Sequence, residues 1–203
     1  GMHVYSKNYN ATANISNYGG TIKGNENSYN ATGVLLDLDE NRLIGFKTDI
    51  DGNPVPMTTD DDRNTFFTNQ GTIELKGDRS TGVYLTGKGK EVTYLEGPNR
   101  RKETMYAASN GAKNISNEEI SGEIIIGDSK NINNPGIGMY SDNAKATIIN
   151  REKGTIEIGK NSIGMAGVNS TTVRNEGIIT IKGDNSIGMY LADGAKGFNT
   201  GTI

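Results

Sequence analysis

The sequence predicts an all-β fold, a right-handed parallel β-helix (β-solenoid) with rungs of about 24 residues, forming one domain over residues 1–203. The first observation is a repeat, because Asn150, Asn175 and Asn199 fall 25 and 24 residues apart. The second is that apolar residues within each repeat alternate with period two, as in strands. The third is the composition: 28 Gly, no Trp and 33% hydrophobic residues are typical of many short strands joined by turns.

Each repeat offers three short strands with inward-facing apolar positions. The first strand contributes the pairs Ile73 and Leu75, Ile124 and Ile126, Ile156 and Ile158, and Ile179 and Ile181. The second contributes Ile137 and Met139, Ile163 and Met165, and Ile187 and Met189. The third contributes one position two residues before an Asn: Ile15, Phe67, Ile115, Ile148 and Val173. Three strands and their turns close one triangular rung, and stacked rungs bury a common core.

The recurring Asn and Gly residues have structural explanations in such a stack. Gly permits positive φ at turns, and an Asn side chain can hydrogen-bond to the equivalent Asn of the next rung. In the earlier, looser copies we assign this position to Asn17, Asn69 and Asn117. No single Asn or Gly therefore requires a chemical role.

Two stretches break the repeat, at about 37–64 and about 86–104. Each lies between recognisable pieces of a rung, so we expect it to loop out of the solenoid or to form a hairpin. Insertions of this kind land on one face of a solenoid and often bind partners.

Residues 175–190, which read Asn-Glu-Gly-Ile-Ile-Thr-Ile-Lys-Gly-Asp-Asn-Ser-Ile-Gly-Met-Tyr, resemble repeats in the passenger domains of fusobacterial-type autotransporters. Residues 150–165 match nearly as well; the likeness is good over about 105–203 and loose over 1–104. The resemblance implies a type V secreted adhesin at the bacterial cell surface or outer membrane, or released from it. Its partner would be a protein or glycan of a host cell or another bacterium. The resemblance supplies no catalytic or ligand motif.

Composition excludes several other classes of function. There is no Cys, and the one His is His3, so thiolate chemistry and a zinc site are not expected. The net charge of -3 is dispersed, which disfavours a nucleic-acid partner. No run of 18 apolar residues exists for direct membrane insertion. Gly1 and the closing Gly201-Thr202-Ile203, which opens another repeat, lead us to expect a piece of a longer protein.

The first insertion contains the densest acids, Asp60, Asp61 and Asp62, which are candidate partner-binding residues. Asp49-x-Asp51-Gly52-Asn53 offers oxygen ligands for calcium, but Pro54 takes the place of the Gly that an EF-hand loop needs. A turn followed by a solvated acidic loop is the favoured interpretation. We therefore expect no metal and no cofactor.

The second insertion contains Tyr94 followed by Arg100 and Arg101, the other candidate partner-binding residues. Basic side chains beside a Tyr can grip an acidic glycan or the carboxylates of a protein partner. The alternative is that this run is only the solvated tip of a loop.

Two outward-facing columns are candidate surfaces for chemistry. The first-strand column reads Lys23, Glu74, Ile125, Glu157 and Thr180, and it forms no acidic pair for catalysis. The second-strand column reads Leu35, Tyr84, Tyr106, Tyr140, Ala166 and Tyr190. Its tyrosines either form a platform for sugar rings or stack as a structural ladder, and the ladder is favoured because Ala166 interrupts it.

The sequence thus predicts a non-enzymatic surface adhesin or interaction module. Two alternatives stay open. One is a β-helical carbohydrate-active enzyme, a polysaccharide lyase or hydrolase using acids of the first insertion. The other is a purely structural spacer.

Overall fold

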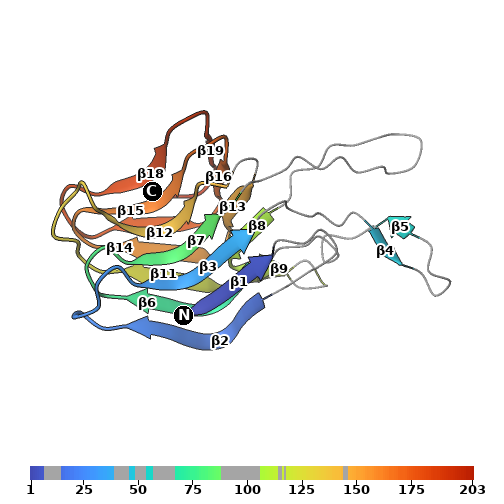
Figure 1. The fold of residues 1–203 in the computed structure, drawn as a ribbon, viewed down its shortest axis with the longest axis horizontal. Coiled ribbons are helices and arrows are strands. Elements are labelled where there is room, and N and C mark those ends of the chain that lie inside the picture. Colours follow the sequence, from blue (N-terminus) through green and yellow to red (C-terminus); the bar gives the residue numbers. More distant parts are fainter. Residues whose placement is uncertain are drawn as a thin grey trace.

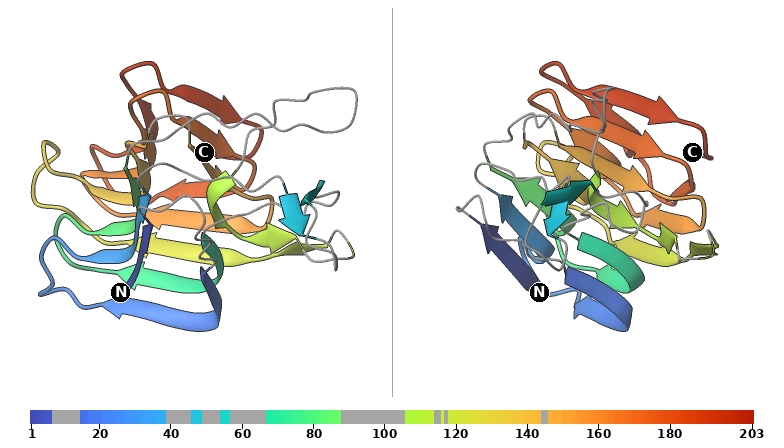
Figure 2. Two further views of the ribbon diagram at one scale, coloured as in Figure 1. Left: turned by 45° about the vertical axis from the view of Figure 1, so that its right-hand side comes forward. Right: turned by 90° about the vertical axis from the view of Figure 1, so that its right-hand side faces the viewer.

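The structure, a computed structural model, describes residues 1–6, 15–38, 46–48, 54–56, 67–87, 106–113, 116, 118–143 and 146–203. Within these ranges the chain forms strands and turns and contains no helix, so none that could cross a membrane. The strands pair in parallel and stack as rungs from β1 and β2 at the N-terminal end to β18 and β19 at the C-terminal end (Figures 1 and 2). The predicted parallel β-helix is confirmed.

One side of the solenoid, here called face A, is a six-stranded parallel sheet. Its strands, in spatial order, are β1 (Met2–Ser6), β3 (Thr32–Leu38), β7 (Thr81–Thr86), β12 (Gly136–Ser141), β15 (Ser162–Gly167) and β18 (Ile187–Leu191). Each of these strands belongs to a different rung.

The second parallel sheet bends sharply and forms the other two sides. The long strand β6 (Phe67–Leu75) shows the bend, because residues 67–69 pair with one neighbour and residues 72–75 with a different one. Face B comprises the first parts of β2 (Ile15–Gly24) and β6, with β8 (Tyr106–Asn110), β13 (Thr147–Asn150), β16 (Thr172–Asn175) and β19 (Lys196–Asn199). Face C comprises the second parts of β2 and β6, with β11 (Gly122–Ile126), β14 (Gly154–Ile158) and β17 (Ile178–Ile181).

The predicted inward columns of faces B and C make up much of the core. The buried aliphatic residues of face C are Ile73, Leu75, Ile124, Ile126, Ile156, Ile158 and Ile179. Face B adds Phe67, Ile148 and Val173, and face A adds Met139 and Met165. Ile181, in the last complete rung, is 43% exposed because no further rung covers it.

The predicted second-strand pairs are only partly right. Ile137 is half-buried and Ile187 is exposed, whereas Ile163 is buried. None of the three belongs to the central core cluster, although the methionine two residues later does in the first two cases. The reason is the intervening glycine: a Cβ on Gly138 would lie 2.7 Å from Ile156 Cγ2 across the interior. The strict alternation therefore fails where glycine lets the backbone of face A approach face C.

The corner between faces B and C contains a continuous ladder of asparagines. The side-chain amide of each Asn donates to the side-chain oxygen of the next at 2.8–2.9 Å, through Asn17, Asn69, Asn110, Asn150, Asn175 and Asn199. Apart from Asn199 these side chains are buried. The predicted hydrogen-bonded stack is confirmed.

One member of the ladder was assigned wrongly. In the third rung the ladder position is taken by Asn110, not Asn117, and the inward residue two before it is Ala108, not Ile115. A short antiparallel hairpin, β9 (Ala112–Lys113) with β10 (Glu119–Ile120), interrupts this rung directly after the ladder residue. Ala108 pairs with Phe67, so a small side chain follows a large one in the core column.

Three long connections begin and end at the corner where face A passes to face B, here called the insertion corner. The connections from β1 to β2, from β3 to β6 and from β7 to β8 all leave and return there. The first predicted insertion includes an antiparallel pair, β4 (Phe46–Thr48) with β5 (Pro54–Pro56), which joins neither parallel sheet (Figure 1).

Candidate functional site

The outer side of face A carries a column of aromatic and small side chains, here called the tyrosine ladder. Successive register partners are His3, Leu35, Tyr84, Tyr140, Ala166 and Tyr190. Tyr106, which the sequence had placed in this column, begins β8 on face B instead. The column is therefore shorter by one tyrosine than predicted, and Tyr84 and Tyr140 are direct neighbours.

Tyr84 and Tyr140 form a stacked pair. Their ring centroids lie 5.1 Å apart with an angle of 24° between the ring planes. The Tyr84 hydroxyl donates to Asp142 Oδ2 at 2.9 Å, which ties the ring to the turn that follows β12. The ladder interpretation is thus confirmed for this pair, and one face of each ring is covered by the other.

Three aspartates line the edge of face A at the insertion corner, here called the acidic edge. Asp37 lies in β3 opposite Thr86, Asp142 directly follows β12, and Asp193 lies just beyond β18. None of the six strands of face A contains a Lys or Arg. The surface of this sheet is therefore aromatic and acidic.

The ionisation of the two stacked tyrosines reflects this environment. Burial raises the pKa of Tyr140 to about 12. The charge of Asp142 raises this pKa further, and Tyr84 and Asp193 add smaller increases. Burial also raises the pKa of Tyr84, and the contact with Asp142 acts in the same direction. Both rings stay neutral hydrogen-bond donors throughout the physiological range.

Face C has a different surface, in which acids and lysines are paired. Its outward column is Lys23, Glu74, Ile125, Glu157 and Thr180, in the predicted register. Glu74 contacts Lys23 at 3.0 Å and Lys76 at 3.1 Å, and these bonds lower the pKa of its carboxyl.

The two glutamates of this column are not neighbours. Ile125 separates Glu74 from Glu157, and Glu157 pairs with Lys182 at 3.6 Å. Two neighbouring carboxylates, as glycosidase chemistry uses, do not occur in this column.

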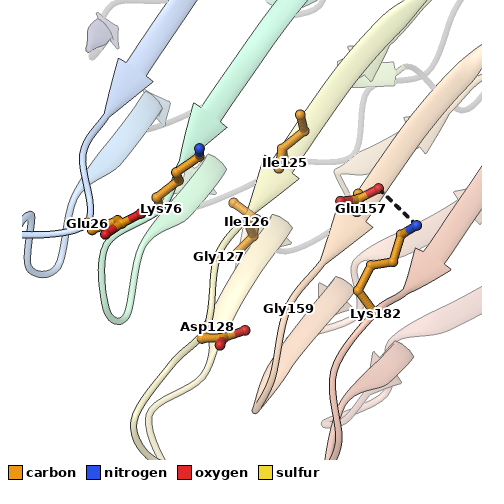
Figure 3. Close-up of a pocket in the computed structure, with 9 residues that line it drawn as sticks. All are labelled: Glu26, Lys76, Ile125, Ile126, Gly127, Asp128, Glu157, Gly159 and Lys182. Carbon is orange, nitrogen blue, oxygen red and sulfur yellow. Dashed lines mark ion pairs between the residues drawn. The ribbon is translucent and has the colours of Figure 1, made fainter.

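A hollow of about 540 Å³ lies on face C next to its corner with face A (Figure 3). Lys76 and Lys182 stand on either side of it, and the equivalent positions of the two rungs between them are Gly127 and Gly159. Those glycines are required by close stacking, because a Cβ on Gly159 would lie 2.8 Å from the Asp128 backbone nitrogen. The hollow is therefore a consequence of rung packing, and three carboxylates and two lysines line it.

The predicted partner-binding residues Asp60, Asp61, Asp62, Tyr94, Arg100 and Arg101 lie outside the described residues, as does the calcium-like turn at 49–53. Both insertions nevertheless begin at the end of a face A strand, beside the acidic edge.

Sequence reasoning did not single out Asp142 or Asp193 as members of a surface. The available signal was an Asp two or three residues after the ladder tyrosine in two repeats, Tyr140-Ser-Asp142 and Tyr190-Leu-Ala-Asp193.

The C-terminal rungs are similar to a known protein family. Residues 102–202 match the family model of the BigA third pectate lyase-like domain. No curated protein and no solved structure matches the chain. The rungs from β8 to β19 are thus similar to a pectate lyase-like β-solenoid domain.

Proposed function

We propose that this chain is a non-enzymatic interaction module of a bacterial surface adhesin, of the fusobacterial autotransporter type. The match to a domain of BigA, an adhesin-like protein, supports a surface role. The partner is a protein or glycan on a host cell or another bacterium, met at the cell surface or by a released passenger.

The observation that carries this proposal is the convergence of features on one edge of the solenoid. The tyrosine ladder, the acidic edge and the starts of both insertions share the insertion corner or the sheet beside it. Elsewhere in the repeat, many side chains already pack in the core, bond within the asparagine ladder or form Lys–Glu pairs. A partner that approaches this edge meets both the rigid sheet and the insertions.

Within the insertions we propose the contacts expected from the sequence, namely Asp60, Asp61 and Asp62 in the first and Tyr94, Arg100 and Arg101 in the second. The test is binding of the labelled chain to host cells and to partner bacteria. Deletion of residues 86–104 should abolish binding while thermal unfolding still shows a folded solenoid. Retention of full binding after deletion of both insertions would overturn the role of the loops.

The enzyme alternative is favoured by one observation, the pectate lyase-like description of the matching family. It predicts new reducing ends or unsaturated uronates when the chain is incubated with a panel of acidic and neutral polysaccharides. Absence of product across the panel, with binding retained, supports the non-enzymatic proposal. Complete absence of binding by the folded chain would instead favour a spacer.

A further inference from the structure

We propose that the hollow on face C binds an uncharged sugar ring of a partner glycan. The hollow lies over Ile125, with Lys76 on one side and Glu157 and Lys182 on the other (Figure 3). The inference rests on the interaction role proposed above and names the chemistry of a second contact. This contact is separate from the insertions, because the hollow lies beside the corner between faces C and A, whereas the insertions begin at the corner between faces A and B.

Two glycines in a lysine-bearing column give the hollow its shape. Backbone pairing places at the same position of four successive rungs Lys76, Gly127, Gly159 and Lys182. Because neighbouring rungs are ~4.8 Å apart, the backbones of the two lysines are three rungs, about 14 Å, apart. Only the backbone of the two glycines lies between them at this position. The volume of about 540 Å³ falls within the range of roughly 300–1,000 Å³ that small-molecule sites have.

The hollow is a fixed feature of the solenoid. A Cβ on Gly127 would lie 2.6 Å from the Lys76 carbonyl oxygen, so no larger residue can fill the space without moving the backbone. Asp128 is held at one end of the hollow, because its Oδ1 accepts the backbone N–H of Lys160 at 2.7 Å. A ligand therefore meets a preformed surface, and binding does not bear the cost of ordering it.

Ile125 gives the hollow an apolar floor. The other members of its outward column are polar, with Glu74 and Glu157 in the two adjacent rungs. The Ile125 side chain is half-buried and lines the hollow. Small-molecule sites combine such apolar surface with a few polar groups that set the orientation of the ligand. The C–H groups of a sugar ring can cover this floor while its hydroxyls reach the walls.

The walls carry charges of both signs, which favours an uncharged ligand. Carboxylates come from Glu26, Asp128 and Glu157, and ammonium groups come from Lys76 and Lys182. An anionic ligand would be repelled by the carboxylates, and a cationic ligand by the ammonium groups. A hydroxyl both donates and accepts, so the hydroxyls of one sugar ring can bond to groups of either sign. Hydrogen bonds to charged groups are roughly twice as strong as those between neutral groups.

Glu157 and Lys182 are the pair best placed to form these bonds. Their charged atoms lie 3.6 Å apart, and their side chains are 47% and 58% exposed. A carboxylate accepts through two oxygens and an ammonium group has three N–H donors, so their contact leaves both able to bond to a ligand. Two adjacent hydroxyls of a sugar can therefore bridge this pair, one donating to Glu157 and the other accepting from Lys182.

The experiment titrates the full chain with three uncharged linear hexasaccharides, made of glucose, mannose or galactose, and follows the Ile125 methyl signal by NMR. Matched charged probes are the hexamers of galacturonic acid and of glucosamine. The decisive variant is Ile125→Lys, which fills the hollow with the residue type that the same column carries at Lys23. Glu157→Ala removes a hydroxyl acceptor from the wall. Lys23→Ala, two rungs from Ile125 in the same column, is the control, and thermal unfolding checks that each variant is folded.

We expect at least one uncharged hexasaccharide to shift the Ile125 signal, and its dissociation constant to rise at least about tenfold in I125K and in E157A but not in K23A. Both charged hexamers should bind more weakly. No shift with any uncharged hexasaccharide, equal binding of a charged hexamer, or undiminished binding by folded I125K or E157A would overturn the proposal.

The two proposals fail separately. Deletion of residues 86–104 should leave hexasaccharide binding unchanged, because the hollow contains no residue of that insertion. Adherence to cells by a chain that binds no hexasaccharide would refute the sugar site alone and leave the proposed function standing. Hexasaccharide binding by a folded chain that adheres to no cell would instead count against the adhesin role.

Discussion

The side-chain amide of Asn110 donates to the side-chain oxygen of Asn150 at 2.8 Å, although the two residues are 40 positions apart in the chain. Asn150 in turn donates to Asn175 at 2.8 Å and to the Ile178 carbonyl at 3.3 Å. Neighbouring members of the ladder are separated by 52, 41, 40, 25 and 24 residues, so the ladder continues where the sequence period does not.

Replacement of Asn150 by Ala removes these bonds and leaves the buried Asn110 amide without one acceptor. We expect the free energy of unfolding to fall by about 2–4 kcal/mol in a denaturant titration. The exposed loop variant Asn133→Ala should change it by less than about 0.5 kcal/mol. Equal stability of the two variants would contradict a supporting role for the ladder.

Gly138→Ala tests the close approach of faces A and C. The added Cβ would lie 2.5 Å from the Gly164 carbonyl oxygen and 2.7 Å from Ile156 Cγ2, and the backbone atom cannot move aside alone. We expect a loss of about 3 kcal/mol or more, or failure to fold. A folded variant with an unchanged thermal midpoint would show that the two faces are less tightly packed than described.

Met139 and Ile137 are two residues apart in β12 but differ in burial, and only Met139 belongs to the core. Met139→Ala should therefore destabilise the chain by about 2–5 kcal/mol. Ile137→Thr should have a much smaller effect, because the register partner of Ile137 in the preceding rung is already Thr81. Comparable losses from both variants would restore the strict alternation that the sequence suggested.

The stacked tyrosines predict a loss of stability at high pH. The pKa of Tyr140 is raised from 10.0 to about 12, chiefly by burial, so the folded chain holds this proton more tightly than the unfolded chain. Stability from this group is fully present below pH 10 and is lost as pH rises towards 12. Tyr140→Phe, which cannot ionise, should lose less stability over this interval in parallel denaturant titrations. Identical pH profiles would contradict the assignment.

The fold was predictable because three independent patterns agreed on one architecture. The Ile-x-Ile alternation, the spacing of the asparagines and the recurring glycines all pointed to stacked parallel rungs, and the register of the face C column was correct to the residue. A repeat fold can be predicted from one sequence when its hydrophobic alternation, its spacing and its turn residues all indicate the same architecture.

The errors lie where the local pattern conflicted with packing across rungs. Ile115-x-Asn117 fits the repeat better than Ala108-x-Asn110, but the core beside Phe67 is filled by the smaller alanine. Met105-Tyr106 likewise imitates Met139-Tyr140, although Tyr106 begins a strand of face B. Contacts between residues about 40 positions apart decided both cases, and a period of about 24 residues does not encode them.

The acidic edge was hidden for a related reason. Asp37, Asp142 and Asp193 lie at the ends of different strands, and only the stacking of rungs brings them beside the tyrosine ladder. The insertions stood out in the sequence because they break the repeat, whereas this rigid surface lies within it.

Adherence of the full chain to host cells and partner bacteria, compared between the unmodified protein and a variant that lacks residues 86–104, tests the proposed interaction role most directly. The account predicts that adherence is lost in the deletion variant while its thermal unfolding still shows a folded solenoid. Full adherence of a folded variant that lacks both insertions would contradict it.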